Sequence, residues 1–269
     1  PEGAGAPRPN ARSVLLGRAG FSILDRQPHP LSFVTVSGAH LYGFPSDDSD
    51  FDLRGVHVTP PDALLSLRPP RETVEDQSTQ DGPLDELVTH DARKYAQLLL
   101  RNNGYVLEQI FSPLVVIEGD LPRWRELARR CIARKHVQHY LGFARSEWTQ
   151  FHRRPEKTVK RLLYVFRVML TGIHLLRTGE VEANLLTLDD EFHLPYVPEL
   201  VAAKRSNGEA AQLPPGKELA FYEREYARLE ALLMETHARS TLPDETPDAR
   251  DGLDAFLREL RFSRESPTA

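Results

Sequence analysis

The chain has 269 residues, 40% of them hydrophobic, and a net charge of −5. This length predicts one or two domains with a buried core. Residues 162–176 form the longest apolar stretch, but Arg167 and His174 interrupt it, so it is too short and too charged to span a bilayer. No signal sequence opens the chain, and its single cysteine, Cys131, has no partner for an internal disulfide. We therefore expect a cytoplasmic protein without a membrane partner.

Charge is distributed unevenly along the chain. Residues 1–118 carry a net −6, residues 119–180 a net +9 and residues 181–269 a net −8. A basic middle segment between acidic flanks suits the binding of polyphosphate or nucleic acid. Solvated helix faces paired with acidic neighbours would give the same numbers, so composition leaves both explanations open.

Strand patterns dominate the first part of the chain. Residues 1–12 are rich in Pro, Gly and Ala, which predicts disorder. Alternating β-branched, aromatic and polar residues then predict four strands, with a loop that contains short elements over residues 62–83. The expected elements, in chain order, are a strand at 31–36, one helical turn at 39–44, strands at 51–58 and 84–90, helices at 91–101 and 105–111, and a strand at 114–119.

Helical periodicity dominates after residue 119. Residues 189–216 contain prolines and an Asn-Gly pair, which predicts a long connection. The expected helices lie at 122–135, 137–151, 156–178, 217–237 and 251–261. Strands with helices followed by helices alone indicate an α+β fold, with one domain at 13–118, an all-helical domain at 119–262 and a tail at 263–269.

Two aspartates at the start of the second predicted strand are candidate metal ligands. Asp50 and Asp52 are two residues apart, so in a strand their side chains share one face. Carboxylate oxygens are ligands that Mg²⁺ prefers, and the next strand offers Asp85 or Glu86 as a third. Alternation alone does not choose between Asp85 and Glu86.

A calcium-binding EF-hand is the first alternative for this acidic cluster. Such a loop needs Gly at its sixth position and Glu at its twelfth, where this chain has Leu53 and Thr59. The EF-hand is therefore excluded. Asp47 and Asp48 are predicted to be turn residues.

The turn that precedes the acids has the character of a phosphate-binding element. Ser37-Gly38 ends a buried strand and begins a helical turn, whose backbone N–H groups can point at a phosphate. A phosphate-binding turn beside metal-binding acids is the arrangement that metal-assisted nucleotidyl transfer needs.

These motifs together resemble a known superfamily. The segment SGAHLYGFPSDDSDFDLRGV, residues 37–56, is similar to the Gly-Ser and Asp-x-Asp motifs of DNA polymerase β-like nucleotidyltransferases. Its extended form resembles the RNA-ligase-associated subgroup of predicted nucleotidyltransferases, and so do residues 89–113 and 160–181, in the expected order. The resemblance implies a small mixed sheet flanked by helices, followed by an all-helical domain.

The resemblance also implies roles for individual residues. Asp50 and Asp52 match the metal-binding pair, and Glu86 falls where the family has its third acid, which favours Glu86 over Asp85. Gly38 matches the glycine of the phosphate-binding turn. The family's serine position is Ala39 here, so a hydroxyl that would contact the triphosphate is missing; Ser37, His40 or the backbone N–H groups are the expected substitutes.

A polar stripe crosses the apolar helix predicted over residues 156–178. It contains Lys160 and Arg167, which the resemblance assigns to the triphosphate. The alternative for Arg167 is an interdomain ion pair with Glu108, because a buried unpaired charge is costly. Four further residues are candidate contacts to a nucleobase or to RNA: Tyr42, Tyr164, Arg153 and Arg154.

The predicted activity is transfer of a nucleoside monophosphate from an NTP to a hydroxyl, with Mg²⁺ or Mn²⁺ and release of pyrophosphate. The subgroup's name implies that the acceptor is an RNA end, in RNA repair or modification. A protein or small-molecule acceptor is the second possibility. The third is a degenerate nucleotide- or RNA-binding module, which the missing serine at Ala39 favours and the three retained acids oppose. No protein partner is predicted.

Overall fold

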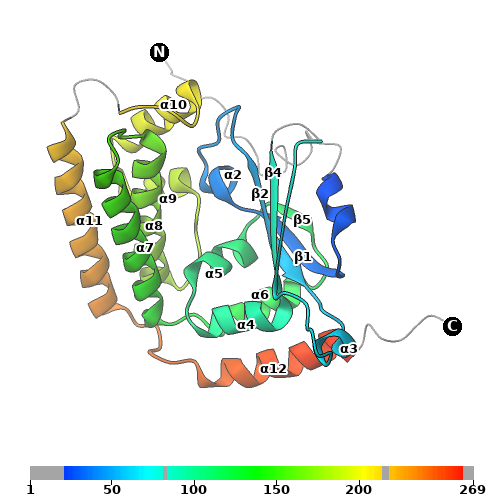
Figure 1. Cartoon of the computed structure of the whole chain (residues 1–269). Helices are drawn as coiled ribbons and strands as arrows, with labels where there is room; N and C mark the ends of the chain where they lie inside the picture. Colours follow the sequence, from blue (N-terminus) through cyan, green and yellow to red (C-terminus); the bar gives the residue numbers. More distant parts are fainter. Residues whose placement is uncertain (1–20, 81–83, 214–217, 263–269) are drawn as a thin grey trace, which may run out of the picture.

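The computed structural model describes residues 21–80, 84–213 and 218–262 (Figure 1). The predicted disorder of residues 1–12 and the predicted tail at 263–269 lie outside these residues. Within the described ranges, every helix is too short or too polar to cross a membrane.

A mixed sheet of five strands forms the first part of the molecule, in the order β3-β4-β2-β1-β5. Strands β2 and β4 are parallel neighbours, whereas the other pairs are antiparallel. The predicted small mixed sheet is therefore confirmed. The strands span Leu31–Val36 (β1), Phe51–His57 (β2), Thr73–Ser78 (β3), Asp85–Asp91 (β4) and Val115–Ile117 (β5).

Strand β3 and a short helix, α3 (Pro61–Leu64), occupy the region predicted to be a loop with short elements. The sequence did not locate the strand at residues 73–78, because its polar sequence TVEDQS has no apolar face to reveal it. Among the strands that the structure describes, β3 pairs with β4 alone and lies at one edge of the sheet. A polar edge strand is also protected against pairing with other chains.

Side-chain caps set where the helices beside the sheet begin. The Asp91 carboxylate accepts a hydrogen bond from the Arg93 amide at 2.9 Å and starts α4 (Ala92–Leu100). The Asn103 side chain accepts from the amides of Tyr105 and Val106 and starts α5 (Gly104–Phe111). Such caps satisfy N–H groups that have no partner within the helix. The remaining elements here are η1 (Ser22–Arg26), α2 (Gly38–Tyr42) and α6 (Leu121–Arg129).

The second part of the chain is helical, as predicted, and is built around α8 (Figure 1). Most of α8 is buried, because α7, α10 and α11 pack around it. Helix α12 runs back beneath α4 and α6, where Phe256 packs edge-on against Trp124. The bounds are η2 (Arg134–His136), α7 (Val137–Arg153), α8 (Val159–Thr178), α9 (Leu185–Phe192), α10 (Val197–Asn207), α11 (Leu219–Arg239) and α12 (Pro247–Phe262).

The predicted connection at 189–216 is wrong in part, because it contains the end of α9 and all of α10. Pro198 lies in the first turn of α10, where proline costs no helical hydrogen bond. Asn207-Gly208 ends the helix rather than marking a loop in its own right. This helix matters for the site, because it carries Lys204 to the turn before Asp50.

Candidate active site

The register of β2 and β4 brings two of the predicted acids together. Asp52 pairs with Glu86 across the parallel strands, so both side chains lie on the same face of the sheet. Asp85 is fully buried and lies on the opposite face. The structure therefore places Glu86, and not Asp85, beside Asp52. Asp50 is exposed and immediately precedes β2.

Arg54 joins these two acids. Its Nη2 donates to Asp52 Oδ1 at 2.8 Å and to Glu86 Oε2 at 3.0 Å. Its Nη1 donates to the backbone carbonyls of Leu53 and Glu86, and its Nε donates to the Tyr105 hydroxyl at 3.1 Å. With this many acceptors, the guanidinium is held in one orientation while both carboxylates stay partly open to solvent.

Burial and neighbouring negative charge raise the pKa of Asp50 and Asp52. The pKa of Asp52 is raised, first by burial, which Arg54 opposes, and then by the charge of Glu86. The pKa of Asp50 is also raised, first by burial, which Lys160 opposes, and then by Glu209 and Glu86. Crowded negative charge of this kind is relieved by a bound cation.

Gly38 allows the phosphate-binding turn to approach Asp52 closely. Its φ is +61°, in the left-handed region, and a Cβ at this position would lie 1.8 Å from Asp52 Oδ2. The Ser37 amide also donates to the backbone carbonyl of Asp52 at 2.8 Å. Any other residue at position 38 would push α2 and Asp52 apart.

The other residues of this turn are less accessible than predicted. Ser37 is fully buried, and its hydroxyl has no hydrogen-bond partner among the described residues. Ala39 is buried as well. The His40 ring stacks on Phe51, with centroids 4.1 Å apart. The Ser37 hydroxyl and the Ala39 side chain are thus enclosed in the core, and His40 is engaged with Phe51.

Lys160 lies near the acids, at the start of α8. Its charge opposes the raised pKa of both Asp50 and Asp52, although its ammonium pairs with Glu209. A cavity of about 520 Å³ opens at this end of α8. Its lining includes Phe143, Arg154, Lys160, Arg161, Tyr164 and Glu209. Two of the predicted contact residues, Tyr164 and Arg154, therefore share a cavity with Lys160, while Arg153 is exposed beside it.

Arg167 and Tyr42 lie instead in a sealed interface between α2, α5 and α8. The Arg167 Nη1 donates to Glu108 Oε2 at 2.8 Å, and its guanidinium lies 3.8 Å from the centre of the Tyr42 ring. Both residues are 2% exposed. The ion pair with Glu108 is the alternative that the sequence left open for Arg167, and neither side chain is open to a ligand at the acids.

Asp52 and Glu86 share one face of the sheet, Asp50 directly precedes β2, and carboxylates fit a divalent cation by donor type. Oδ2 of Asp52 lies over the glycine at position 38, in space that a side chain would fill. Within residues 21–80, 84–213 and 218–262, no three His, Cys, Asp or Glu side chains are already gathered as a complete ligand set. Asp52 and Glu86 are instead joined through Arg54, which a bound cation would compete with.

Comparison with known proteins identifies the family. Residues 21–259 match the model of the RNA repair pathway DNA polymerase beta family. The chain belongs to this family. This confirms the resemblance predicted from the glycine turn and the Asp-x-Asp motif.

Two relatives and one solved structure of another protein are similar to this chain. An uncharacterised protein of Methanocaldococcus jannaschii is 26% identical over 219 residues, covering 79% of this chain and 87% of its own. An uncharacterised protein of Bacillus subtilis, YcgL, is 27% identical over 144 residues, covering 51% and 53%. A nucleotidyltransferase-like protein from Exiguobacterium sibiricum aligns with 91% of this chain and 78% of its own, at 12% identity and a TM-score of 0.31.

The sequence did not reveal three residues of this candidate site, Arg54, Lys204 and Glu209. Arg54 had a local signal, because Asp50, Asp52 and Arg54 follow one another at the strand period and so share a face. Lys204 and Glu209 had none. They lie more than 150 positions from Ser46 and Ser49, which they contact.

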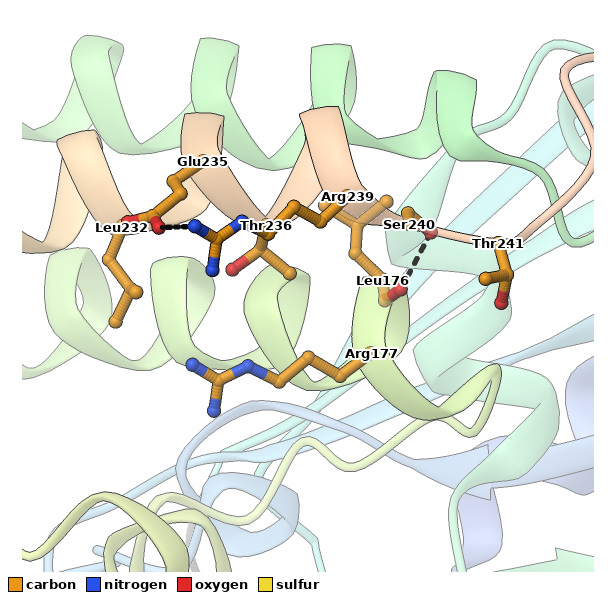
Figure 2. A pocket seen from close by; sticks show the side chains of 8 residues that line it. All are labelled: Leu176, Arg177, Leu232, Glu235, Thr236, Arg239, Ser240 and Thr241. Carbon is orange, nitrogen blue, oxygen red and sulfur yellow. Dashed lines mark hydrogen bonds and ion pairs between the residues drawn. The ribbon is translucent and has the colours of Figure 1, made fainter.

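A second cavity, of about 260 Å³, lies between the C-terminal ends of α8 and α11 (Figure 2). Its two arginines are already paired, Arg177 with Glu191 and Arg239 with Glu235. The Ser240 hydroxyl donates to the backbone carbonyl of Leu176 at 2.6 Å. Leu176 lies sixteen helical steps after Lys160 in α8, roughly 24 Å along the helix, so this cavity is separate from the candidate site.

Proposed function

We propose that this chain transfers a nucleoside monophosphate from an NTP to a hydroxyl at an RNA end, with release of pyrophosphate. The register of β2 and β4 carries the proposal, because it sets Asp52 beside Glu86 on one face of the sheet. The turn at Gly38 approaches the same face. Family membership supports the same chemistry.

Asp50, Asp52 and Glu86 would hold Mg²⁺ or Mn²⁺. When bound, such an ion neutralises phosphate charge and lowers the pKa of the attacking hydroxyl. The backbone N–H groups that follow Gly38 and the ammonium of Lys160 bind the triphosphate. The acceptor oxygen forms a bond to the α-phosphorus, the bond from that phosphorus to the bridging oxygen breaks, and a carboxylate of the cluster accepts the hydroxyl proton. Catalysis is then mainly positioning and charge stabilisation.

The cavity beside Lys160 supports an RNA acceptor. Arg154 and Arg161 carry charges that suit phosphates, and Phe143 and Tyr164 offer rings on which an unpaired base can stack. The segment from 119 to 180, which supplies all these residues, carries the net +9 charge. The name of the family also refers to RNA repair.

The deciding experiment follows the label of each α-labelled NTP, with Mg²⁺ or Mn²⁺ and with RNA, a protein mixture or no acceptor. We expect label on RNA and none with Asp52→Asn. Asp47→Asn is the matched control, because Asp47 is an exposed aspartate of the same turn. Label on protein instead would show that the acceptor is a protein and not RNA, and the proposal of nucleotidyl transfer would stand. Absence of transfer to any acceptor would refute the proposal.

A further inference from the structure

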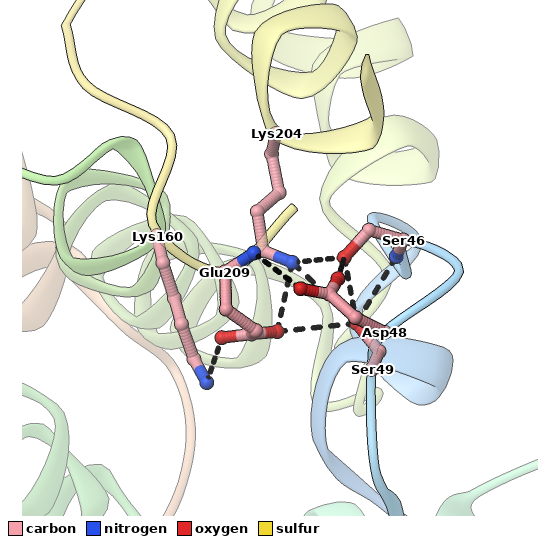
Figure 3. Close-up of polar contacts among 6 residues, drawn as sticks. All are labelled: Ser46, Asp48, Ser49, Lys160, Lys204 and Glu209. Carbon is pink, nitrogen blue, oxygen red and sulfur yellow. Dashed lines mark hydrogen bonds and ion pairs between the residues drawn. The ribbon is translucent and has the colours of Figure 1, made fainter. Parts of the chain in front are cut away.

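A lysine from the second half of the chain, Lys204, is fully buried beside the acidic turn of residues 46–49 (Figure 3). Lys204 lies near the end of α10, and its side chain is 0% exposed. Its Nζ donates to Ser46 Oγ at 2.5 Å and Glu209 Oε1 at 2.8 Å, with Ser49 Oγ at 3.4 Å. A buried ammonium needs a paired anion, which Glu209 supplies.

Glu209 connects this lysine to both parts of the proposed site. Its Oε2 pairs with Lys160, and its Oε1 accepts from Lys204 and from Ser49 Oγ at 3.2 Å. Its own amide donates to Asp48 Oδ2 at 3.1 Å. Figure 3 shows Glu209 between the two lysines, with the acidic turn on the other side.

The approach of the two segments depends on Gly208. Its φ is +69°, and a Cβ here would lie 2.6 Å from Asp48 Oδ2. The turn of residues 46–49 is thereby clamped from one side by the end of α10. Strand β2, with Asp52, begins directly after this turn and Asp50.

The two lysines differ in how freely they can change partners. Burial alone would raise the pKa of Glu209, but hydrogen bonds from Lys160 and Lys204 lower it overall, so the carboxylate stays charged. Because Lys204 is sealed, moving Glu209 away would leave an unpaired buried charge. Lys160 is 40% exposed, so it can turn toward a ligand without that cost.

We propose that Lys204 and Glu209 are positioning residues for the nucleotide site. Lys204 fixes Glu209, and Glu209 then holds the Lys160 ammonium at the cavity beside the acids while both fix the turn that leads to Asp50. The inference rests on the proposed function. It gives the helical part of the chain a direct role in receiving the phosphates of the NTP.

The kinetic test uses Glu209→Gln and the double variant Lys204→Met/Glu209→Gln. The double variant removes the buried charge together with its partner, so it folds where a single change leaves Lys204 unpaired. We expect KM for the NTP to rise about fivefold, which corresponds to the free energy that one partly exposed ion pair contributes. We expect kcat to change by less than about twofold. Glu235→Gln, in an exposed pair with Arg239, is the matched control. A lower KM in the variants would show that Glu209 competes with the triphosphate, which overturns the proposal.

A second measurement is independent of turnover. Hydrogen–deuterium exchange of residues 46–52 should be faster in the double variant than in the unmodified chain, with exchange in α11 unchanged. Equal exchange in the turn would overturn the inference even if transfer activity is present. If the unmodified chain transfers no nucleotide, binding of inorganic tripolyphosphate by calorimetry replaces KM. Weaker binding in the variants then supports the positioning role while the proposed function fails, and unchanged or tighter binding overturns it.

Discussion

Two buried arginines of this chain hold carboxylates in different ways. Arg54 divides its guanidinium between Asp52 and Glu86, whose side chains are 24% and 36% exposed. Arg167 is sealed against a single acid, Glu108, which is 1% exposed. The first arrangement is partly open to solvent near the N-terminal ends of the inner strands β2 and β4, and the second is buried between α2, α5 and α8.

The difference in exposure decides what each arginine can do. At Arg167, burial raises the pKa of Glu108 even though the arginine opposes the rise, so the pair is stable only while both members are present. At Arg54, water screens the charges, and the carboxylates can exchange the guanidinium for another cation. The sealed pair therefore joins the two parts of the molecule, whereas the open group is suited to ligand exchange.

The largest expected effect comes from a change at Asp52, in the group around Arg54, and it is on nucleotide transfer. Asp52→Asn should reduce nucleotide transfer by at least about 10²-fold, because it removes one charge of the cluster at the reaction centre. Its circular dichroism spectrum and melting temperature should stay close to those of the unmodified chain. Transfer at the original rate by Asp52→Asn would disprove the assignment of the site.

The sealed pair should show its effect in stability. Arg167→Met leaves Glu108 buried without a counter-charge, and we expect the free energy of unfolding to fall by about 3–5 kcal/mol. Urea denaturation measures this. The double variant Arg167→Met/Glu108→Gln should recover much of the loss because no lone charge remains. A single variant as stable as the unmodified chain would contradict the role of the pair.

Removal of Arg54 should reduce the free energy of unfolding less than removal of Arg167 does. The melting temperature of the Arg54 variant should also respond to metal. Arg54→Met lowers the free energy of unfolding by about 2 kcal/mol, because charged hydrogen bonds are lost. Mn²⁺ should then raise the melting temperature of this variant more than that of the unmodified chain, since the cation offsets repulsion between Asp52 and Glu86. Arg93→Met, in an exposed pair with Glu72, is the control. An equal response to Mn²⁺ in all three would argue against metal exchange at Arg54.

A smaller effect, on the pH dependence of stability, should come from His136, which is buried without a counter-charge. Burial lowers the pKa of His136 to about 4, against about 6.5 in the unfolded chain. The unfolded state thus binds more protons between these values, and stability is lost as the pH falls from about 6.5 toward 4. We expect the contribution of His136 to the free energy of unfolding to fall by about 2 kcal/mol between pH 7 and pH 5.

The comparison of His136→Asn with the unmodified chain isolates this effect. The variant should show a smaller decrease in the free energy of unfolding over the same pH range, measured by urea denaturation. His193→Asn is the matched control, because His193 is exposed and asparagine tolerates its left-handed backbone. An identical pH dependence in His136→Asn and the unmodified chain would be inconsistent with a neutral buried His136.

Local patterns predicted much of the fold. Strands β1, β2 and β4 and helices α4, α7, α8 and α11 were expected close to their observed bounds, because strong periodicity and caps such as Asp91 are local features. Strand β3 was missed because its polar sequence lacks that periodicity, and α10 was hidden by Pro198. Both elements owe their formation to neighbours that lie elsewhere in the chain.

The sequence by itself determined the Asp-x-Asp spacing and the glycine turn before it, since a motif and a positive φ are properties of a few consecutive residues. Only the tertiary structure decided that Glu86 stands beside Asp52, that Arg54 joins them and that Arg167 is sealed against Glu108. It also decided that Lys204 and Glu209 reach the turn at Ser46. These contacts depend on strand register and helix packing between distant segments, and no short stretch of sequence specifies either.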